Sequence, residues 1–315
     1  MNLLSSEILK IRGDFLSAIR RFFEKNGFLE IDTPCLLEIP GMEPYLDPFL
    51  VKAPKSQEGG YLITSPEYSL KQALSMGLEK VYEIAHAFRS GEKGGIHTKE
   101  FLMLEFYQTE INELELMDVC IEFFYFLNSE FRDFGFDKNN CQKVKVEDLF
   151  ITNTGSSFSK SELLQTIQNK MDYDPKTINN FYYDDLFFLV FLNFIEPHLD
   201  KGPIFVYDYP EELASLAKVE NNRAKRFEIY WNRVELGNAF FENISQEVQV
   251  DRFKEEQNRR KELGKEVFPI NRDFLLTLER GLPVSSGISI GLDRLLMIIL
   301  GHNDLRHLSP YWGRK

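Results

Sequence analysis

Two glutamates in the stretch Arg226–Glu242 are spaced so that they could hold a metal ion together. We predict a β-hairpin with its tip at Trp231 and Asn232, which sets Glu228 directly opposite Glu235. At about 5 Å and an effective dielectric near 20, two like charges repel by roughly 3 kcal/mol, and a divalent cation would remove this cost. The alternative is a solvated hairpin whose glutamates point into water.

The return strand of this hairpin carries a second set of polar and aromatic residues. Asn238, Phe240 and Glu242 recur at period two, so they share one face of the strand. We therefore expect the same hairpin to offer both a metal site and a carboxylate that binds an amine.

A fourth candidate acid lies in the apolar strand Phe101–Tyr107, in which Glu105 is the one charged residue. Burying an unpaired carboxylate is costly, so Glu105 needs a cationic or hydrogen-bonding partner. Arg89, at the end of the preceding strand, is one candidate. Arg89 is equally suited to a phosphate or carboxylate ligand, because its planar guanidinium binds both bidentately.

Near the C-terminus, the stretch Gly287–Arg294 passes from a strand into a helix at Gly291. The backbone N–H groups at a helix start favour an anion, and Arg294 adds a full charge. An ion pair between Arg294 and Asp293 is the structural alternative. The basic run Arg259–Lys261 lies in a helix of mixed charge, and we predict a solvated face there.

Composition limits the class of protein. The chain has 315 residues, 43% of them hydrophobic, and 49 acidic against 37 basic residues, a net charge of −12. This balance does not favour a protein devoted to gripping nucleic acid. Three scattered cysteines, no signal-peptide pattern and no apolar run of membrane-spanning length are typical of the reducing cytoplasm.

The order of elements favours an α+β fold with an antiparallel β-sheet flanked by helices, because neighbouring strands are joined by loops. We expect helices at 5–26, 65–76, 246–263, 273–280 and from 291, and strands at 28–31, 61–64, 81–89, 101–107, 204–209, 226–230, 234–242 and 286–290.

Several of these residues together resemble the three ordered motifs of class II aminoacyl-tRNA synthetases. The resemblance covers residues 5–301 and narrows to the lysyl branch. It is carried by the first helix with Pro34, by Phe88, Arg89, His97, Glu100, Phe101 and Glu105, by Gly291–Arg294, by Ser65–Glu67 and by Glu235–Glu242.

The resemblance implies a single catalytic domain over residues 1–315, with a mainly helical insertion at about 110–200 and no anticodon-binding domain. This organisation is similar to that of short lysyl-tRNA synthetase paralogues, which activate (R)-β-lysine with ATP and transfer it to a lysine side chain of translation elongation factor P. The alternatives are activation of α-lysine for another acceptor, or a catalytically silent regulator.

The resemblance also implies roles for individual residues. The amino-acid substrate would contact Ser65, Pro66, Glu67, Glu105, Tyr107, Asn238, Phe240 and Glu242. ATP would contact Arg89, Ser90, Gly91, Thr98, Glu235, Leu236, Gly291 and Arg294, with Arg89 and Arg294 stabilising charge in the transition state. Glu228 and Glu235 would bind Mg²⁺.

Two positions depart from the family pattern. The second motif commonly has an acid two residues after the arginine, whereas here Gly91 occupies that place and Glu92 follows it. At Ser289 the synthetases usually have glycine, which hints at a substrate other than an α-amino acid. The resemblance further implies a homodimer formed through the first helix and Pro34.

Overall fold

Two compact units make up the chain. The computed structural model describes residues 5–56, 58–92 and 94–308. Unit 1 comprises Met1–Phe136 with Glu242–Lys315, and unit 2 comprises Asp137–Phe241. The single catalytic domain with a helical insertion at about 110–200 stays a prediction.

Unit 1 is built on four strands in the order β1-β5-β6-β12. They are β1 Leu29–Glu30, β5 Lys80–Phe88, β6 Glu100–Thr109 and β12 Ser285–Gly291. The β1–β5 pair is parallel, whereas β6 pairs antiparallel with both β5 and β12. A smaller sheet has the order β2-β4-β3, with β2 Leu36–Leu37, β3 Leu50–Lys52 and β4 Gly59–Leu62.

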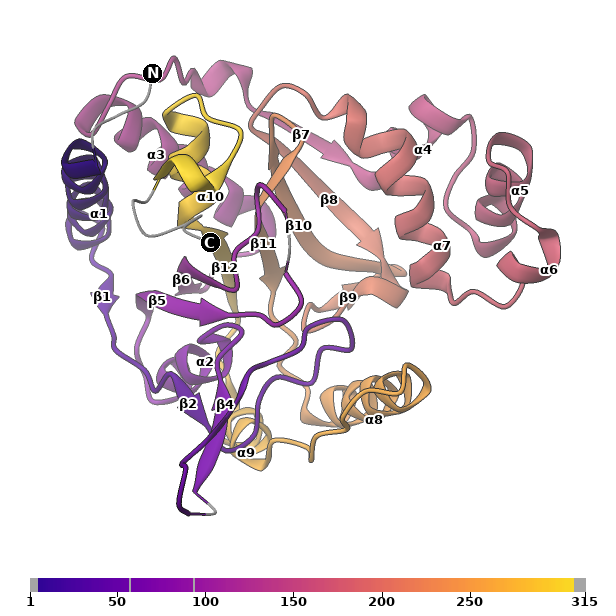
Figure 1. Cartoon of the computed structure of the whole chain (residues 1–315), viewed down its shortest axis with the longest axis horizontal. Helices are drawn as coiled ribbons and strands as arrows, with labels where there is room; N and C mark the ends of the chain where they lie inside the picture. The colour runs from indigo at the N-terminus through magenta and orange to yellow at the C-terminus, as the bar shows by residue number, and fades with distance from the viewer. Residues whose placement is uncertain (1–4, 57, 93, 309–315) are drawn as a thin grey trace. The chain divides into compact units, whose positions relative to one another are not determined.

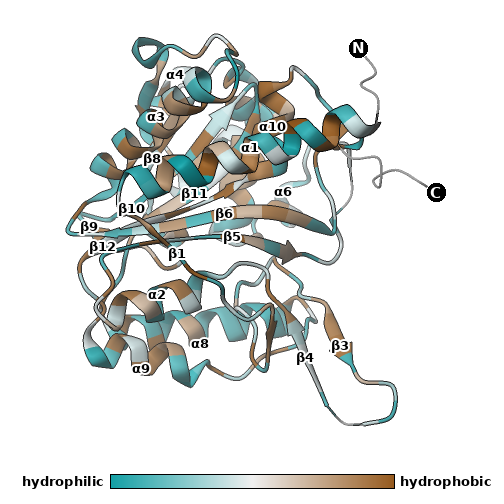
Figure 2. Cartoon of the chain, turned by 90° about the vertical axis from the view of Figure 1, so that its left-hand side faces the viewer, coloured by the Kyte–Doolittle hydropathy of each residue, from teal (hydrophilic) through white to brown (hydrophobic). Residues whose placement is uncertain are grey.

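Helices cover both faces of the larger sheet of unit 1. Figure 2 shows α1 on one face of β5 and β6, and α2, α8 and α9 on the other. The bounds are α1 Ser5–Lys25, α2 Glu67–Ser75, α3 Glu113–Glu130, α8 Gln246–Glu262, α9 Arg272–Gly281 and α10 Leu292–Ile299, with a 3-10 turn at Leu305–Leu308. Helix α2 packs against β5 and β6, and β6 carries Glu105.

An aromatic cluster fixes α1 on this sheet. The ring of Phe23 lies 4.5 Å from that of Tyr82 on β5 and 5.0 Å from that of Phe106 on β6. Phe123 of α3 closes the cluster at 5.7 Å from Phe23. Each buried aromatic side chain contributes roughly 1.5–3 kcal/mol, so the cluster makes β5 and β6 a rigid support.

Unit 2 contains the strands β7 Gln142–Lys145, β8 Ile204–Pro210, β9 Val219–Glu220, β10 Arg223–Trp231 and β11 Val234–Phe241. Strand β10 pairs antiparallel with β8, β9 and β11, and β7 pairs parallel with β8. Its helices are α4 Val146–Thr154, α5 Lys160–Lys170, α6 Pro175–Ile178 and α7 Tyr183–Val190, with a π turn at Phe191–Ile195 and 3-10 turns at Lys138–Asn140, Glu196–His198 and Glu211–Leu213. Helix α4 packs on β7 and β8 (Figure 1).

The predicted elements agree closely with the observed ones, and the α+β class is confirmed. The helix predicted over 5–26 is α1, and the strands predicted over 81–89 and 101–107 are the antiparallel pair β5 and β6. Among the described residues, no helix combines the length and apolarity that crossing a membrane requires.

Candidate active site

The start of α2 places the hydroxyl of Ser65 between two functional groups. Ser65 Oγ accepts a hydrogen bond from the backbone N–H of Glu67 at 3.0 Å, which satisfies one of the first N–H groups of the helix. The same hydroxyl donates to Glu105 Oε2 at 2.8 Å, and Tyr107 OH donates to Glu105 Oε1 at 2.6 Å. Glu105 thus has the hydrogen-bonding partners that the sequence predicted, and Ser65 and Tyr107 supply them.

A buried lysine that the sequence analysis missed joins two more carboxylates to this group. Lys71 Nζ lies 2.6 Å from Glu67 Oε1 and 2.5 Å from Glu242 Oε2. Glu67 and Lys71 are four residues apart on α2, a spacing that places both side chains on one face. Ser65, Glu67, Glu105, Tyr107 and Glu242 are hereafter called the acidic pocket.

Burial and neighbouring charges shift the pKa values of the carboxylates in the acidic pocket. Burial, followed by the charge of Glu67, raises the pKa of Glu105 to about 8. Burial also raises the pKa of Glu242 to about 8, against the opposing charge of Lys71. Burial disfavours the charged form of Lys71, but Glu242 and Glu67 outweigh it and raise the pKa of Lys71 to about 12. The pocket therefore contains more acid than its own lysine can neutralise.

Strand β12 shapes the floor of the acidic pocket. Gly287 lies opposite Tyr107, and a Cβ at this glycine would sit 2.0 Å from the Tyr107 ring. A side chain at 287 would therefore displace the phenol that holds Glu105. Ser289 lies opposite Glu105 in the same ladder, so the second departure from the family pattern is beside a pocket carboxylate.

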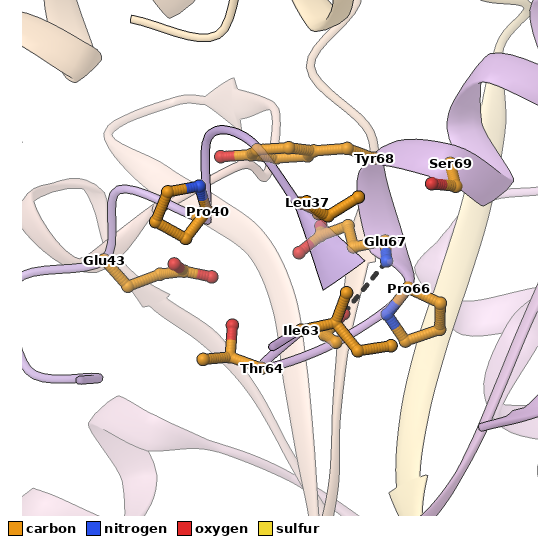
Figure 3. Close-up of a pocket in the computed structure, with 11 residues that line it drawn as sticks. Leu37, Pro40, Glu43, Ile63, Thr64, Pro66, Glu67, Tyr68 and Ser69 are labelled. Atoms are coloured by element: carbon orange, nitrogen blue, oxygen red, sulfur yellow. Dashed lines mark hydrogen bonds between the residues drawn. The ribbon is translucent and has the colours of Figure 1, made fainter. Parts of the chain in front are cut away.

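A neighbouring pocket opens beside Glu67. It is lined by the loop after β2, the end of β4 and the first turn of α2, and Figure 3 shows Glu43 and Glu67 extending toward each other across it. Burial, then the charge of Glu67, raises the pKa of Glu43. A Cβ at Gly41 would lie 2.2 Å from Glu43 Oε2, so a larger residue at 41 would require this carboxylate to move. Glu43 adds a further acid near the acidic pocket.

The loop that carries Glu43 is held by Arg260 of α8, and the solvated face predicted for Arg259–Lys261 is wrong for Arg260, whereas Lys261 is exposed. The Arg260 side chain is 1% exposed, and its Nη1 donates to the carbonyl oxygens of Glu43 at 2.8 Å and Leu46 at 3.0 Å. Arg259 donates to Tyr45 OH at 2.7 Å. An irregular loop leaves carbonyl groups without ladder partners, and the guanidinium supplies the missing donors.

The loop between β5 and β6 gathers Arg89 and Arg294. Arg294 Nε donates to the carbonyl of Ile96 at 3.1 Å, and the Arg89 guanidinium lies 5.2 Å from the centroid of the Phe101 ring. Burial, then the charge of Arg294, lowers the pKa of His97, with a smaller lowering from Arg89. Glu92, one position later than the family pattern, lies 3.5 Å from His97 Nε2.

The remaining candidate anion contacts of unit 1 occupy the same loop and the start of α10. The backbone N–H of Ser90 donates to the carbonyl of Asp47 at 2.7 Å, Gly91 has a φ of +83°, and Thr98 Oγ1 donates to the carbonyl of Glu100. Gly291 precedes the first residue of α10. Asp293 pairs with Arg12 at 2.5 Å rather than with Arg294.

In unit 2 the hairpin exists, but its predicted register is wrong. Asn232 and Arg233 both have positive φ, 50° and 65°, and form a two-residue turn one position later than expected. Glu235 therefore lies opposite Tyr230, and a register shift beyond Tyr230 sets Glu228 opposite Asn238. Glu228 and Glu235 are diagonal neighbours on one face and not an opposed pair, so the predicted repulsion across the ladder does not arise.

Glu228 is instead part of a hydrogen-bonded network. It accepts from Tyr209 OH at 2.6 Å and from Tyr230 OH at 2.7 Å, and it forms an ion pair with Arg226. Arg226 also donates to Asn238 Oδ1 at 2.8 Å, and its guanidinium lies 5.8 Å from the centroid of the Phe240 ring. We refer to Arg226, Glu228, Tyr209 and Tyr230 as the arginine network.

The structure brings together five of the predicted substrate residues, those of the acidic pocket, and Pro66 connects two of them at the start of α2. Asn238, Phe240, Leu236 and Glu235 all lie on β11 of unit 2. Sequence reasoning missed Lys71 and Arg226. The four-residue spacing from Glu67 signals Lys71, and the two-residue spacing from Glu228 on one strand face signals Arg226.

Comparisons with known proteins agree with this geometry. The profile of class II tRNA synthetases (D, K and N) matches residues 1–313. The elongation factor P–(R)-β-lysine ligase of Edwardsiella ictaluri (strain 93-146) is 34% identical over 311 residues, 95% of this chain and 93% of that protein. The ligase of the same name from Enterobacter sp. (strain 638) is 35% identical over 308 residues, 95% of this chain and 93% of that protein. The one from Buchnera aphidicola (subsp. Acyrthosiphon pisum, strain Tuc7) is 34% identical over 317 residues, 98% of this chain and 95% of that protein.

The resemblance noted in the sequence is thus confirmed over nearly the whole chain. With an acidic pocket in unit 1 and a matching profile from residue 1 to residue 313, this chain belongs to the class II tRNA synthetases (D, K and N).

Proposed function

We propose that this chain is an ATP-dependent ligase that activates (R)-β-lysine and transfers it to a lysine side chain of translation elongation factor P. The observation that carries the proposal is the acidic pocket, in which Glu67, Glu105 and Glu242 outnumber Lys71. A diamino acid brings two ammonium groups to such an excess of carboxylates. The names of the relatives in Edwardsiella and Enterobacter support the same substrate and acceptor.

Activation requires little proton transfer in this proposal. The carboxylate of the amino acid is ionised and attacks the α-phosphorus of ATP, so that pyrophosphate leaves and an aminoacyl-adenylate forms. Arg89 and Arg294 would stabilise the negative charge that gathers on the phosphates. In the second step the ε-amine of the acceptor lysine attacks the acyl carbon and AMP leaves. Positioning and electrostatics supply most of the catalysis.

The residues fit a magnesium ion that is held partly by phosphate oxygens. Glu228 and Glu235 share one face of the hairpin, and a magnesium site commonly needs only one or two carboxylates in addition to phosphates. Glu228 Oε2 accepts hydrogen bonds from both Tyr209 and Tyr230, whereas Oε1 pairs with Arg226 and retains a second lone pair for a metal ion. Bound there, Mg²⁺ would neutralise phosphate charge.

Ser289 favours the β-amino acid over α-lysine. It lies opposite Glu105, where the synthetases usually have glycine, so a hydroxymethyl group replaces a hydrogen atom beside a carboxylate that we assign to a substrate amine. An enzyme that modifies a translation factor would act in the cytoplasm. A homodimer, and the roles of Ser90, Gly91, Thr98, Leu236, Asn238, Phe240 and Gly291, stay predictions.

Intact-mass analysis tests the proposal. Elongation factor P is incubated with the protein, ATP, Mg²⁺ and each lysine isomer, and we expect a mass gain of one lysyl unit, largest with (R)-β-lysine. Pyrophosphate exchange with each isomer separates activation from transfer. Faster exchange with α-lysine would favour the alternative substrate, and ATP binding without exchange would favour a silent regulator.

A further inference from the structure

Lys71 is buried more completely than its charge normally allows. Its side chain is 1% exposed, and its ammonium bridges Glu67 and Glu242 at 2.6 and 2.5 Å. The ammonium also lies 5.8 Å from the centroid of the Tyr107 ring and 5.9 Å from that of Phe274. A buried lysine persists only where paired charges compensate its desolvation, so the bridge to both acids is what keeps Lys71 in place.

Glu242 is only half satisfied by this bridge. Its Oε2 faces Lys71, whereas its buried Oε1 has no hydrogen-bond partner among the described residues. Glu242 is 2% exposed, and its backbone N–H is fixed by the carbonyl of Ser285 at 2.9 Å. A buried acceptor without a donor is costly, and an ammonium group of a ligand would satisfy it.

Two roles for Lys71 fit a lysine-binding pocket. In one, its ammonium is a placeholder that the substrate ammonium displaces. In the other, it stays and orients the carboxylates. Displacement would leave a buried ammonium between two aromatic rings without its acids, which is costly. Helix α2 also carries both Glu67 and Lys71, so the Glu67 half of the bridge forms within one helix.

We propose that Lys71 is a positioning residue of the acidic pocket, which holds Glu67 and Glu242 in place and directs Glu242 Oε1 toward an ammonium group of the substrate. This inference rests on the proposed function, because it assumes a diamino acid in the pocket. In this proposal the preference for a substrate with two ammonium groups depends on Lys71, which positions the carboxylates that bind them. Three carboxylates against one resident ammonium leave two negative charges when all are ionised, which matches two substrate ammonium groups.

The test compares Lys71→Met and Lys71→Arg with a matched control, Lys170→Met. Lys170 is also a helical lysine, with a hydrogen bond to the carbonyl of Thr154 at 2.7 Å and a position 5.8 Å from the Phe194 ring, but it lies in unit 2. We expect Lys71→Met to raise the KM for the diamino acid about 100-fold, as loss of one partner of a buried charge pair does, and the KM for ATP less than about twofold. Lys71→Arg should recover about tenfold of that loss because it keeps the cation. The control should leave both constants within about twofold.

A lower KM for the diamino acid in Lys71→Met would overturn the proposal in favour of a placeholder. Equal increases in both KM values would also overturn it, since a general structural role predicts that result. If Lys71→Met does not fold, Lys71→Ala is assayed with added propylammonium, which replaces the missing part of the side chain, and with propanol as the uncharged control. Saturable recovery of the KM for the diamino acid with propylammonium alone supports the proposal. Equal behaviour of the two additives contradicts it.

Calorimetric titration separates this inference from the proposed function. Wild-type protein and the Lys71 variants are titrated with (R)-β-lysine, cadaverine and norleucine, without ATP. Diamine binding that weakens in Lys71→Met supports the role of Lys71 even where pyrophosphate exchange is absent and the proposed ligase activity fails. Ligase activity in wild type together with unchanged diamine affinity in Lys71→Met contradicts the role of Lys71 alone.

Discussion

The acidic pocket of unit 1 and the arginine network of unit 2 contain the same types of side chain, but they differ in whether the buried carboxylate oxygens are all hydrogen-bonded. Both bury glutamate carboxylates and hold them with tyrosine hydroxyl groups and one basic side chain: in the network all of these bind Glu228, whereas in the pocket Tyr107 binds Glu105 and Lys71 pairs with Glu67 and Glu242. In the network, both Glu228 oxygens accept hydrogen bonds, so the charge is balanced within the fold. In the pocket, Glu242 Oε1 has no hydrogen-bond partner among the described residues. Excess acid together with an unsatisfied buried oxygen therefore marks the acidic pocket as a site for a cationic ligand.

The largest effect that tests this comparison is expected for Glu242→Gln. The substitution removes the charge that a substrate ammonium and Lys71 share, so we expect kcat/KM for the diamino acid to fall about 1000-fold, or roughly 4 kcal/mol. The KM for ATP should change less than about twofold, since Glu242 belongs to the pocket. Pyrophosphate exchange measures both. Glu220→Gln, a half-exposed glutamate in unit 2, is the control. A comparable loss in the control would contradict the assignment.

Substitutions in the arginine network should lower the stability of the protein. Arg226→Met leaves Glu228 buried without its cation, which should lower the free energy of unfolding by about 3 kcal/mol. Urea denaturation measures the change. Lys225→Met removes a neighbouring, better solvated ion pair with Asp208 and should cost less than about 1 kcal/mol. If the double variant Arg226→Met/Glu228→Gln is as unstable as Arg226→Met alone, the network does not depend on this charge pair.

Glu235→Gln tests whether the hairpin serves ATP and the pocket serves the amine. Loss of one magnesium ligand should lower kcat/KM for ATP about 30-fold and raise the Mg²⁺ concentration needed for half-maximal exchange. The KM for the diamino acid should change little. Initial rates of exchange over a Mg²⁺ series give both results. Identical defects in Glu235→Gln and Glu242→Gln would remove the proposed division of labour.

The sequence predicted local structure well where a short-range signal sets it. Ser65 and Pro66 before α2 marked the helix start, and a continuous apolar run with a single charge marked β6 and the buried Glu105. The prediction of the residue opposite Glu228 was wrong, although the error in the position of the turn was small. The turn moved by one residue and the ladder shifted beyond Tyr230, which changed the partner of Glu228 from Glu235 to Asn238.

Long-range packing limited the rest. The burial of Arg260 depends on a loop more than 200 residues earlier in the chain, which supplies the carbonyl groups that its guanidinium binds. The seven-residue spacing from the buried Phe253 places Arg260 on the inner face of α8, but it does not reveal the carbonyl groups that Arg260 binds. The role of Lys71 depends on Glu242 from a distant strand end, although its spacing from Glu67 pointed to an ion pair on α2.

The smallest expected effect is on the pH dependence of stability, because burying the excess carboxylates in their charged form destabilises the ligand-free protein. Burial raises the pKa of Glu105 from 4.5 to about 8, so between these values the folded state binds more protons than the unfolded state. Stability of the ligand-free protein should therefore fall as pH rises through this window, and the full penalty should be present above pH 8. Glu105→Gln resembles the protonated acid and should be more stable than wild type by about 1 kcal/mol at pH 8.5, or roughly 2–4 °C in Tm, with a smaller difference at pH 5.

Thermal unfolding at both pH values measures the difference, and Glu100→Gln, a half-exposed residue on the same strand, is the control. Equal differences at the two pH values would show that the acidic pocket stores no charge penalty. Saturation with a diamino acid should remove the wild-type penalty at pH 8.5, because the ligand supplies the missing cations and binds only the folded state. Glu228 offers the contrasting case, since the fold already supplies it with a cation in Arg226.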